Sequence, residues 1–126
     1  MNFATHQKWI WVPGMAFRLA GVKFRIVDVD ATGIYVLATS FNNPTGDDLL
    51  WLTPTHYGAE PDLEDEPTVE LLTLVLRAVR NAPDGACRPL VGGGWIWEDR
   101  PNAFEGFAFF GEAPAVAMHR ALWSAV

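Results

Sequence analysis

Short apolar runs of strand length, each closed by glycine, proline or aspartate, fill the first half of this 126-residue chain. The clearest run covers residues 22–29, where apolar and basic positions alternate up to Ile26 and then change sides. Successive strand side chains face opposite ways, so this change predicts a β-bulge near Ile26. Further runs at 9–12, 16–19, 34–38 and 49–53 predict a meandering antiparallel sheet over residues 8–53, curled like a small SH3-type barrel.

The second half predicts an α-β-β-α unit. A helix is expected over residues 67–81, because Pro67 suits a first helical turn and Pro83 follows the last periodic residue. Two strands are expected over residues 90–98 and 104–110, and a closing helix from Pro114 to the end of the sequence. The sequence therefore predicts the α+β class, arranged as a single domain over residues 1–126.

Composition indicates a chain that forms its own core in a reducing compartment. Half of the residues are hydrophobic, and Cys87 is the only cysteine, so no internal disulfide can form. No apolar run reaches 18 residues, and the first 25 residues lack the continuous apolar segment of a signal peptide. We expect a cytoplasmic protein with no membrane span.

Charge is divided unevenly along the sequence. Residues 1–25 hold four bases and no acids, residues 26–76 hold ten acids and no Lys or Arg, and residues 77–126 hold five of each. A stretch of charge −10 would repel a phosphate backbone, so nucleic acid is an unlikely partner. The acidic run at 60–66 is best explained as a solvated loop that caps the following helix.

One candidate ligand site lies in the irregular connection at 54–67. His56, Asp62 and Glu64 could converge as polar groups of a small-ligand or hydrolytic pocket. A zinc site needs three or four ligands at recognisable spacing, and this segment lacks such spacing. Ordinary loop residues beside a helix start explain the same pattern, and no metal or cofactor is predicted.

Signatures of catalysis are rejected one by one. Cys87 stands in no Cys/His motif, and no serine stands in a Gly-x-Ser-x-Gly turn. The glycines at 92–94 precede an apolar strand instead of the Gly-Lys-Ser/Thr that opens a phosphate-binding helix. Such glycines more often mark a bulge or the close approach of another backbone. The sequence therefore favours a protein that is not an enzyme.

Two Trp-Ile-Trp segments offer a second candidate site. Trp9 and Trp11 share one strand face, and Trp95 and Trp97 share another. Two interpretations stay open: the indoles pack in the core, or they form a partly exposed patch that binds a protein partner or a second copy.

Two stretches resemble small uncharacterised proteins of bacteriophages and prophages. One is residues 61–68, Pro-Asp-Leu-Glu-Asp-Glu-Pro-Thr, leading into the Leu-rich helix, with Glu66 inserted relative to the resembling motif. The other is residues 107–122, an aromatic strand followed by Gly-Glu-Ala-Pro and an Ala-rich helix. The resemblance implies an accessory protein of a mobile element. The group has no general assigned activity, so no functional residue carries over. The leading hypothesis is a non-catalytic interaction or self-associating module; the alternatives are the ligand pocket and an inhibitor of a host defence protein.

Overall fold

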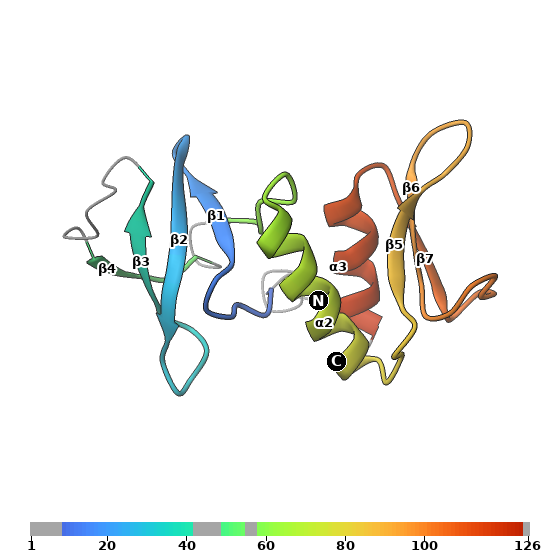
Figure 1. Cartoon of the computed structure of the whole chain (residues 1–126), viewed down its shortest axis with the longest axis horizontal. Coiled ribbons are helices and arrows are strands. Elements are labelled where there is room, and N and C mark those ends of the chain that lie inside the picture. Colours follow the sequence, from blue (N-terminus) through green and yellow to red (C-terminus); the bar gives the residue numbers. More distant parts are fainter. Residues whose placement is uncertain (1–8, 42–48, 55–57, 125–126) are drawn as a thin grey trace. The chain divides into compact units, whose positions relative to one another are not determined.

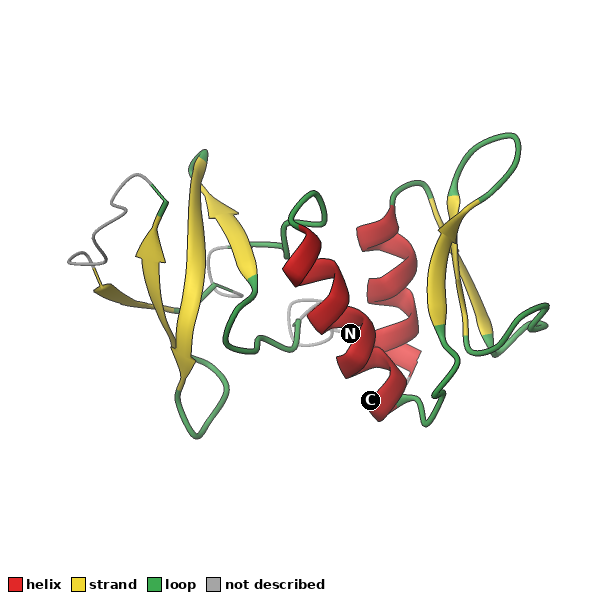
Figure 2. Ribbon diagram, viewed as in Figure 1, coloured by secondary structure: helices red, strands yellow, loops and turns green. Residues whose placement is uncertain are grey.

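The computed structural model describes residues 9–41, 49–54 and 58–124 (Figure 1). Two compact units make up the chain: an N-terminal unit of residues 8–71, and a C-terminal unit of residues 72–126 together with residues 1–7. Each unit contains one antiparallel sheet, and two helices complete the described elements (Figure 2). The predicted α+β class is confirmed, whereas the single domain over residues 1–126 stays a prediction.

The N-terminal unit is built on a four-stranded meander. Its strands are β1 (Ala16–Leu19), β2 (Val22–Val29), β3 (Val36–Ser40) and β4 (Leu49–Leu52), in the order β1-β2-β3-β4. Ala20 and Gly21 join β1 to β2, and both have the positive φ that a two-residue type I′ turn requires. The SH3-like curvature of this sheet stays a prediction.

The predicted bulge in β2 is confirmed. Ile26 pairs with Ala38 of β3, but the next partnered residue of β2 is Asp28, opposite Leu37, so one residue is skipped. This extra residue, Val27, is the reason why the apolar side chains change faces in the sequence. Ile26 and Ala38 are both buried, which places the inner face of the sheet at this pair.

The predicted strand at residues 9–12 is wrong. This segment is irregular and ends in a turn at Pro13 and Gly14, whose backbone N–H donates to the Ile26 carbonyl over 2.9 Å. Trp11 packs edge-on against Phe17 with ring centroids 5.5 Å apart. The alternation of aromatic and aliphatic residues therefore serves core packing, since no neighbouring strand provides a ladder of hydrogen bonds.

Helix α2 (Glu66–Val79) begins and ends as its sequence indicates. Asp65 caps its start, because its Oδ2 accepts the Thr68 backbone N–H over 3.2 Å. After the last turn Asn81 adopts a positive φ, and the Ala82 N–H donates to the Arg77 carbonyl, a common way for a helix to stop. The boundary between the two units falls within this helix.

The C-terminal unit contains a three-stranded sheet and helix α3 (Pro114–Ser124), which packs against it (Figure 2). The strands are β5 (Ala86–Pro89), β6 (Trp95–Glu98) and β7 (Ala108–Gly111), in the order β5-β6-β7. The sequence predicted only two strands here. β5 was missed because Ala86–Pro89 contains a proline and an arginine and shows no apolar alternation.

Glycines 92–94 form the loop between β5 and β6, and all three have positive φ. A Cβ atom on Gly94 would lie 3.3 Å from the Gly111 carbonyl oxygen of β7. The predicted close approach of another backbone is therefore found at Gly94. The stretch predicted as a strand at 104–110 begins instead as a turn, and only residues from Ala108 onward pair with β6.

Candidate interaction surface

Most of the tryptophans singled out in the sequence lie in the core. Trp9, Trp11 and Trp97 are buried, and Trp95 is half-buried. The Trp97 indole N–H donates to Asp99 Oδ1 over 2.9 Å. Burial of these side chains supports the core interpretation, and we place the candidate interaction surface elsewhere.

The predicted ligand pocket of His56, Asp62 and Glu64 stays a prediction. His56 lies outside the described residues, and the Glu64 side chain is exposed. Asp62 is buried, and its Oδ1 accepts the Glu64 backbone N–H over 3.1 Å. Its own N–H donates to the Ala16 carbonyl over 2.8 Å, so Asp62 holds the loop against β1. No group of three or more His, Cys, Asp or Glu that could hold a metal occurs in the described part of the chain.

The uneven charge of the sequence is explained by ion pairs inside the N-terminal unit. Arg25 donates to both carboxylate oxygens of Asp65, at 2.7 and 2.9 Å, and Lys23 Nζ lies 3.1 Å from Oδ1. The Thr68 hydroxyl donates to the same carboxylate over 2.6 Å. The hydrogen bonds from Arg25 outweigh burial and hold the pKa of Asp65 well below its ordinary value. The basic first segment and the acidic second segment therefore neutralise each other where they meet.

Cys87 is a poor nucleophile in this structure. Burial raises the pKa of its thiol to about 11, and the thiolate is the reactive form. At neutral pH almost all of the thiol is protonated.

A buried arginine fixes the base of the β6–β7 hairpin. Arg80 Nε and Nη2 donate to the two carboxylate oxygens of Asp99 over 2.7 and 2.9 Å, and both side chains are about nine-tenths buried. The remaining donors reach the carbonyls of Ala121 and Gly106. The guanidinium also lies over the Phe109 ring, 4.4 Å from its centroid. These contacts join the end of α2 to β7 and α3.

Electrostatics favour this pair in its charged form. Burial alone would raise the pKa of Asp99, but hydrogen bonds from Arg80 and Trp97 outweigh it, and the pKa lies below its ordinary value. Asp99 therefore stays ionised and paired. The two opposite charges cancel, so the pair offers no net charge to a ligand. Its contacts hold the base of the hairpin in place.

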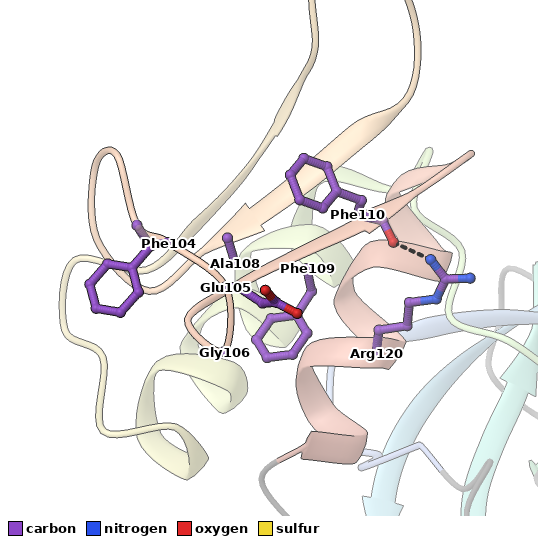
Figure 3. A pocket seen from close by; sticks show the side chains of 8 residues that line it. Phe104, Glu105, Gly106, Ala108, Phe109, Phe110 and Arg120 are labelled. Carbon is purple, nitrogen blue, oxygen red and sulfur yellow. Dashed lines mark hydrogen bonds between the residues drawn. The ribbon is translucent and has the colours of Figure 1, made fainter.

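Beyond this rigid base the hairpin presents what we call the phenylalanine surface: Phe104, Phe107 and Phe110. These side chains are 61%, 42% and 54% exposed. Phe104 and Phe107 meet edge to face, with ring centroids 5.2 Å apart. Phe104 and Phe110 line a hollow of about 700 Å³ (Figure 3), together with Ala103, Glu105, Gly106, Ala108, Phe109 and Arg120. Exposed aromatic side chains beside a hollow are typical of a binding surface.

Two arginines border this surface. Arg100 lies 5.5 Å from the ring centroid of Phe104 and 5.6 Å from that of Phe107. Arg120 reaches from α3 toward β7, where its Nη1 donates to the Phe110 carbonyl over 2.6 Å (Figure 3). Glu105 is the one acid in the lining of the hollow. Cationic groups therefore outnumber acids around the exposed rings.

The sequence did carry a signal for this surface. Asn102 and Gly106 both have positive φ; Pro101-Asn102 precedes the stretch 104–110 that was predicted as a strand, and Gly106 interrupts it. A turn at these positions removes Phe104 and Phe107 from the sheet, so neither ring is covered by a neighbouring strand. These turn residues therefore favour a loop that exposes aromatic side chains.

Comparison with known proteins gives no relative for the chain. No family model matches it, no curated protein matches it, and no solved structure matches its fold. No described helix is long and apolar enough to cross a membrane.

Proposed function

We propose that this chain is a non-catalytic interaction module that binds a protein partner through the phenylalanine surface. One observation carries the proposal: Phe104 and Phe110, which are 61% and 54% exposed, line a hollow of about 700 Å³, and the half-exposed Phe107 contacts Phe104. Exposed apolar patches often mark interaction sites, and phenylalanine is among the residues enriched in protein interfaces.

The size of the surface sets the strength of binding. Three half-exposed rings offer on the order of 300 Å² of apolar area, since a whole ring buries roughly 200 Å². At about 25 cal/mol per Å² this area contributes about 7 kcal/mol. Association itself costs about 4–15 kcal/mol, so further contacts in the hollow and with the arginines are required. Micromolar affinity corresponds to about 8 kcal/mol after this cost, so most of the binding energy has to come from those further contacts.

The partner is a protein segment with a bulky apolar side chain next to an Asp or Glu. The apolar side chain fills the hollow beside Phe104 and Phe110, and the carboxylate lies near Arg100 or Arg120. Arginine is suited to this role because its planar guanidinium pairs with a carboxylate through two hydrogen bonds. Glu105 disfavours segments rich in acids, so a single flanking carboxylate fits best.

The resemblance to small phage and prophage proteins supports the same class of function. An accessory protein of a mobile element that acts in the cytoplasm of its host, for example as an inhibitor of a host defence protein, requires a surface that recognises another protein. That surface would recognise an apolar side chain beside a carboxylate, and experiment can identify the partner that carries them.

The test is a selection of random peptides displayed on beads against the immobilised protein. Bound peptides are expected to share an apolar residue beside a carboxylate. Phe104→Ala and Phe110→Ala are each expected to weaken binding of a selected peptide by about tenfold or more. Tyr35→Ala is the matched control, because Tyr35 is a half-exposed aromatic residue of the other unit. The proposal is overturned if no common sequence is selected, or if all three variants bind the peptide equally.

A further inference from the structure

The two edges of the N-terminal sheet differ in how they are covered. At the β1 edge, Ala16 donates its N–H to the Thr68 hydroxyl over 2.7 Å and accepts the Asp62 N–H over 2.8 Å. Phe17 also forms a bridge with Pro61. The loop before α2 thus uses the hydrogen-bonding groups that an edge strand would otherwise expose. Proteins commonly cover an edge in this way to prevent unwanted pairing.

The β4 edge lacks such protection among the described residues. β4 is the last strand in the sheet order, at the outer side of the sheet in Figure 1. Its residues Leu49, Leu50 and Trp51 are 48%, 42% and 55% exposed. Leu49–Leu52 contains no charge, no proline and no glycine, which are the usual means of blocking an edge. Leu49 and Trp51 stand opposite Thr39 and Leu37, so apolar side chains occupy both faces of this strand.

We infer that β4 pairs antiparallel with β4 of a second copy of this chain, which extends the two sheets into one of eight strands. A closed two-fold pair of antiparallel strands places one residue opposite its own copy. With Trp51 on the axis, Trp51 faces Trp51 of the second copy, and Leu50 faces Leu52. Cross-strand apolar and aromatic pairs each contribute about 0.2–1 kcal/mol, and no charged residue of β4 meets a like charge.

A second copy fits this edge better than an unrelated strand, because its own β4 presents the same uncharged, mostly apolar residues. The pairs Trp51–Trp51 and Leu50–Leu52 join apolar residues, Leu49 faces the uncharged Thr53, and the hydrogen-bonding groups of the two edges can satisfy one another. The interface of two four-residue strands is smaller than the roughly 800 Å² per partner of a stable dimer. The dimer is therefore weak, with a dissociation constant in about the micromolar range. This inference rests on the N-terminal unit and is independent of the phenylalanine surface.

Sedimentation equilibrium of the full chain tests the inference. The mass is expected to rise from 13.9 kDa toward twice that value as the concentration increases from about 5 to 500 µM. Trp51→Lys and Leu50→Lys are expected to remain at 13.9 kDa throughout, since each places a charge at the paired edge. Val91→Lys is the control, because Val91 is fully exposed at a hairpin loop of the other unit. Circular dichroism establishes that each variant is folded.

Two outcomes overturn the inference. One is a constant mass of 13.9 kDa for the wild-type chain at every concentration. The other is a dimer that persists equally in Trp51→Lys, Leu50→Lys and Val91→Lys, which would place the contact elsewhere in the molecule. Peptide binding at the phenylalanine surface is unaffected by either result.

Discussion

Removing the carboxylate of Asp99 is expected to destabilise the C-terminal unit strongly. Asp99→Ala leaves the guanidinium of Arg80, which is 7% exposed, with only carbonyl acceptors and the Phe109 ring. It also removes the Asp99 acceptor of the Trp97 indole N–H, and an unsatisfied buried donor costs about 1–3 kcal/mol. Breaking a buried ion pair costs about 3–5 kcal/mol, so we expect a loss of that size in the free energy of unfolding.

The assay is equilibrium unfolding in urea followed by circular dichroism. Arg100→Ala is the control, because Arg100 is exposed, stacks over aromatic rings and acts on Asp99 only through a longer-range charge interaction, so it should cost less than about 1 kcal/mol. The double variant Arg80→Met, Asp99→Leu should cost less than the sum of the two single changes, since it removes both charges together. The reasoning is refuted if Asp99→Ala costs no more than Arg100→Ala.

Three further outcomes follow from individual residues. Asp65 has a lowered pKa, so its carboxylate stabilises the fold above about pH 4 and this contribution is lost as the pH falls. The difference in unfolding free energy between wild type and Asp65→Asn should therefore shrink between about pH 5 and pH 2; a constant difference would contradict the pairing with Arg25. Cys87, with a pKa of about 11, should react with iodoacetamide at pH 7.5 much more slowly in the folded than in the urea-unfolded chain, and equal rates would refute its burial. Gly85→Ala should cost about 1–3 kcal/mol in urea unfolding, because its Cβ would overlap the Trp97 ring, and an unchanged midpoint would show that the ring moves aside.

Local sequence patterns predicted those elements whose cause is local. The change of faces at Ile26 identified the bulge in β2, and Pro67 together with Asp65 identified the start of α2 within one residue. Both depend on side-chain periodicity or on capping chemistry within a few residues. The same holds for the close approach at Gly94, since glycine is the residue that such an approach requires.

Features decided by tertiary packing could not be predicted in this way. Trp9 and Trp11 alternate with aliphatic residues as in a strand, but the segment is irregular and both indoles are buried. β5 forms because β6 offers it a ladder, although Arg88 and Pro89 give it no strand pattern of its own. Local propensity is weaker than such contacts.

The candidate surface was missed for a related reason. A sequence pattern does not distinguish an aromatic residue that a neighbouring strand covers from one that is exposed. The turns at Asn102 and Gly106 place Phe104 and Phe107 outside the sheet, and both side chains are exposed in the structure. Conversely, the tryptophans were weighed as possible surface residues and proved to fill the core.

The central claim, that the phenylalanine surface binds a protein partner, is tested most directly by nuclear magnetic resonance. The ¹⁵N-labelled chain is titrated with a peptide selected for binding, and the backbone amide shifts are followed. The account predicts that saturable shifts concentrate in residues 100–111 and around Arg120, which border the hollow. Saturable shifts confined to the N-terminal unit, or the same shifts in Phe104→Ala, would contradict it.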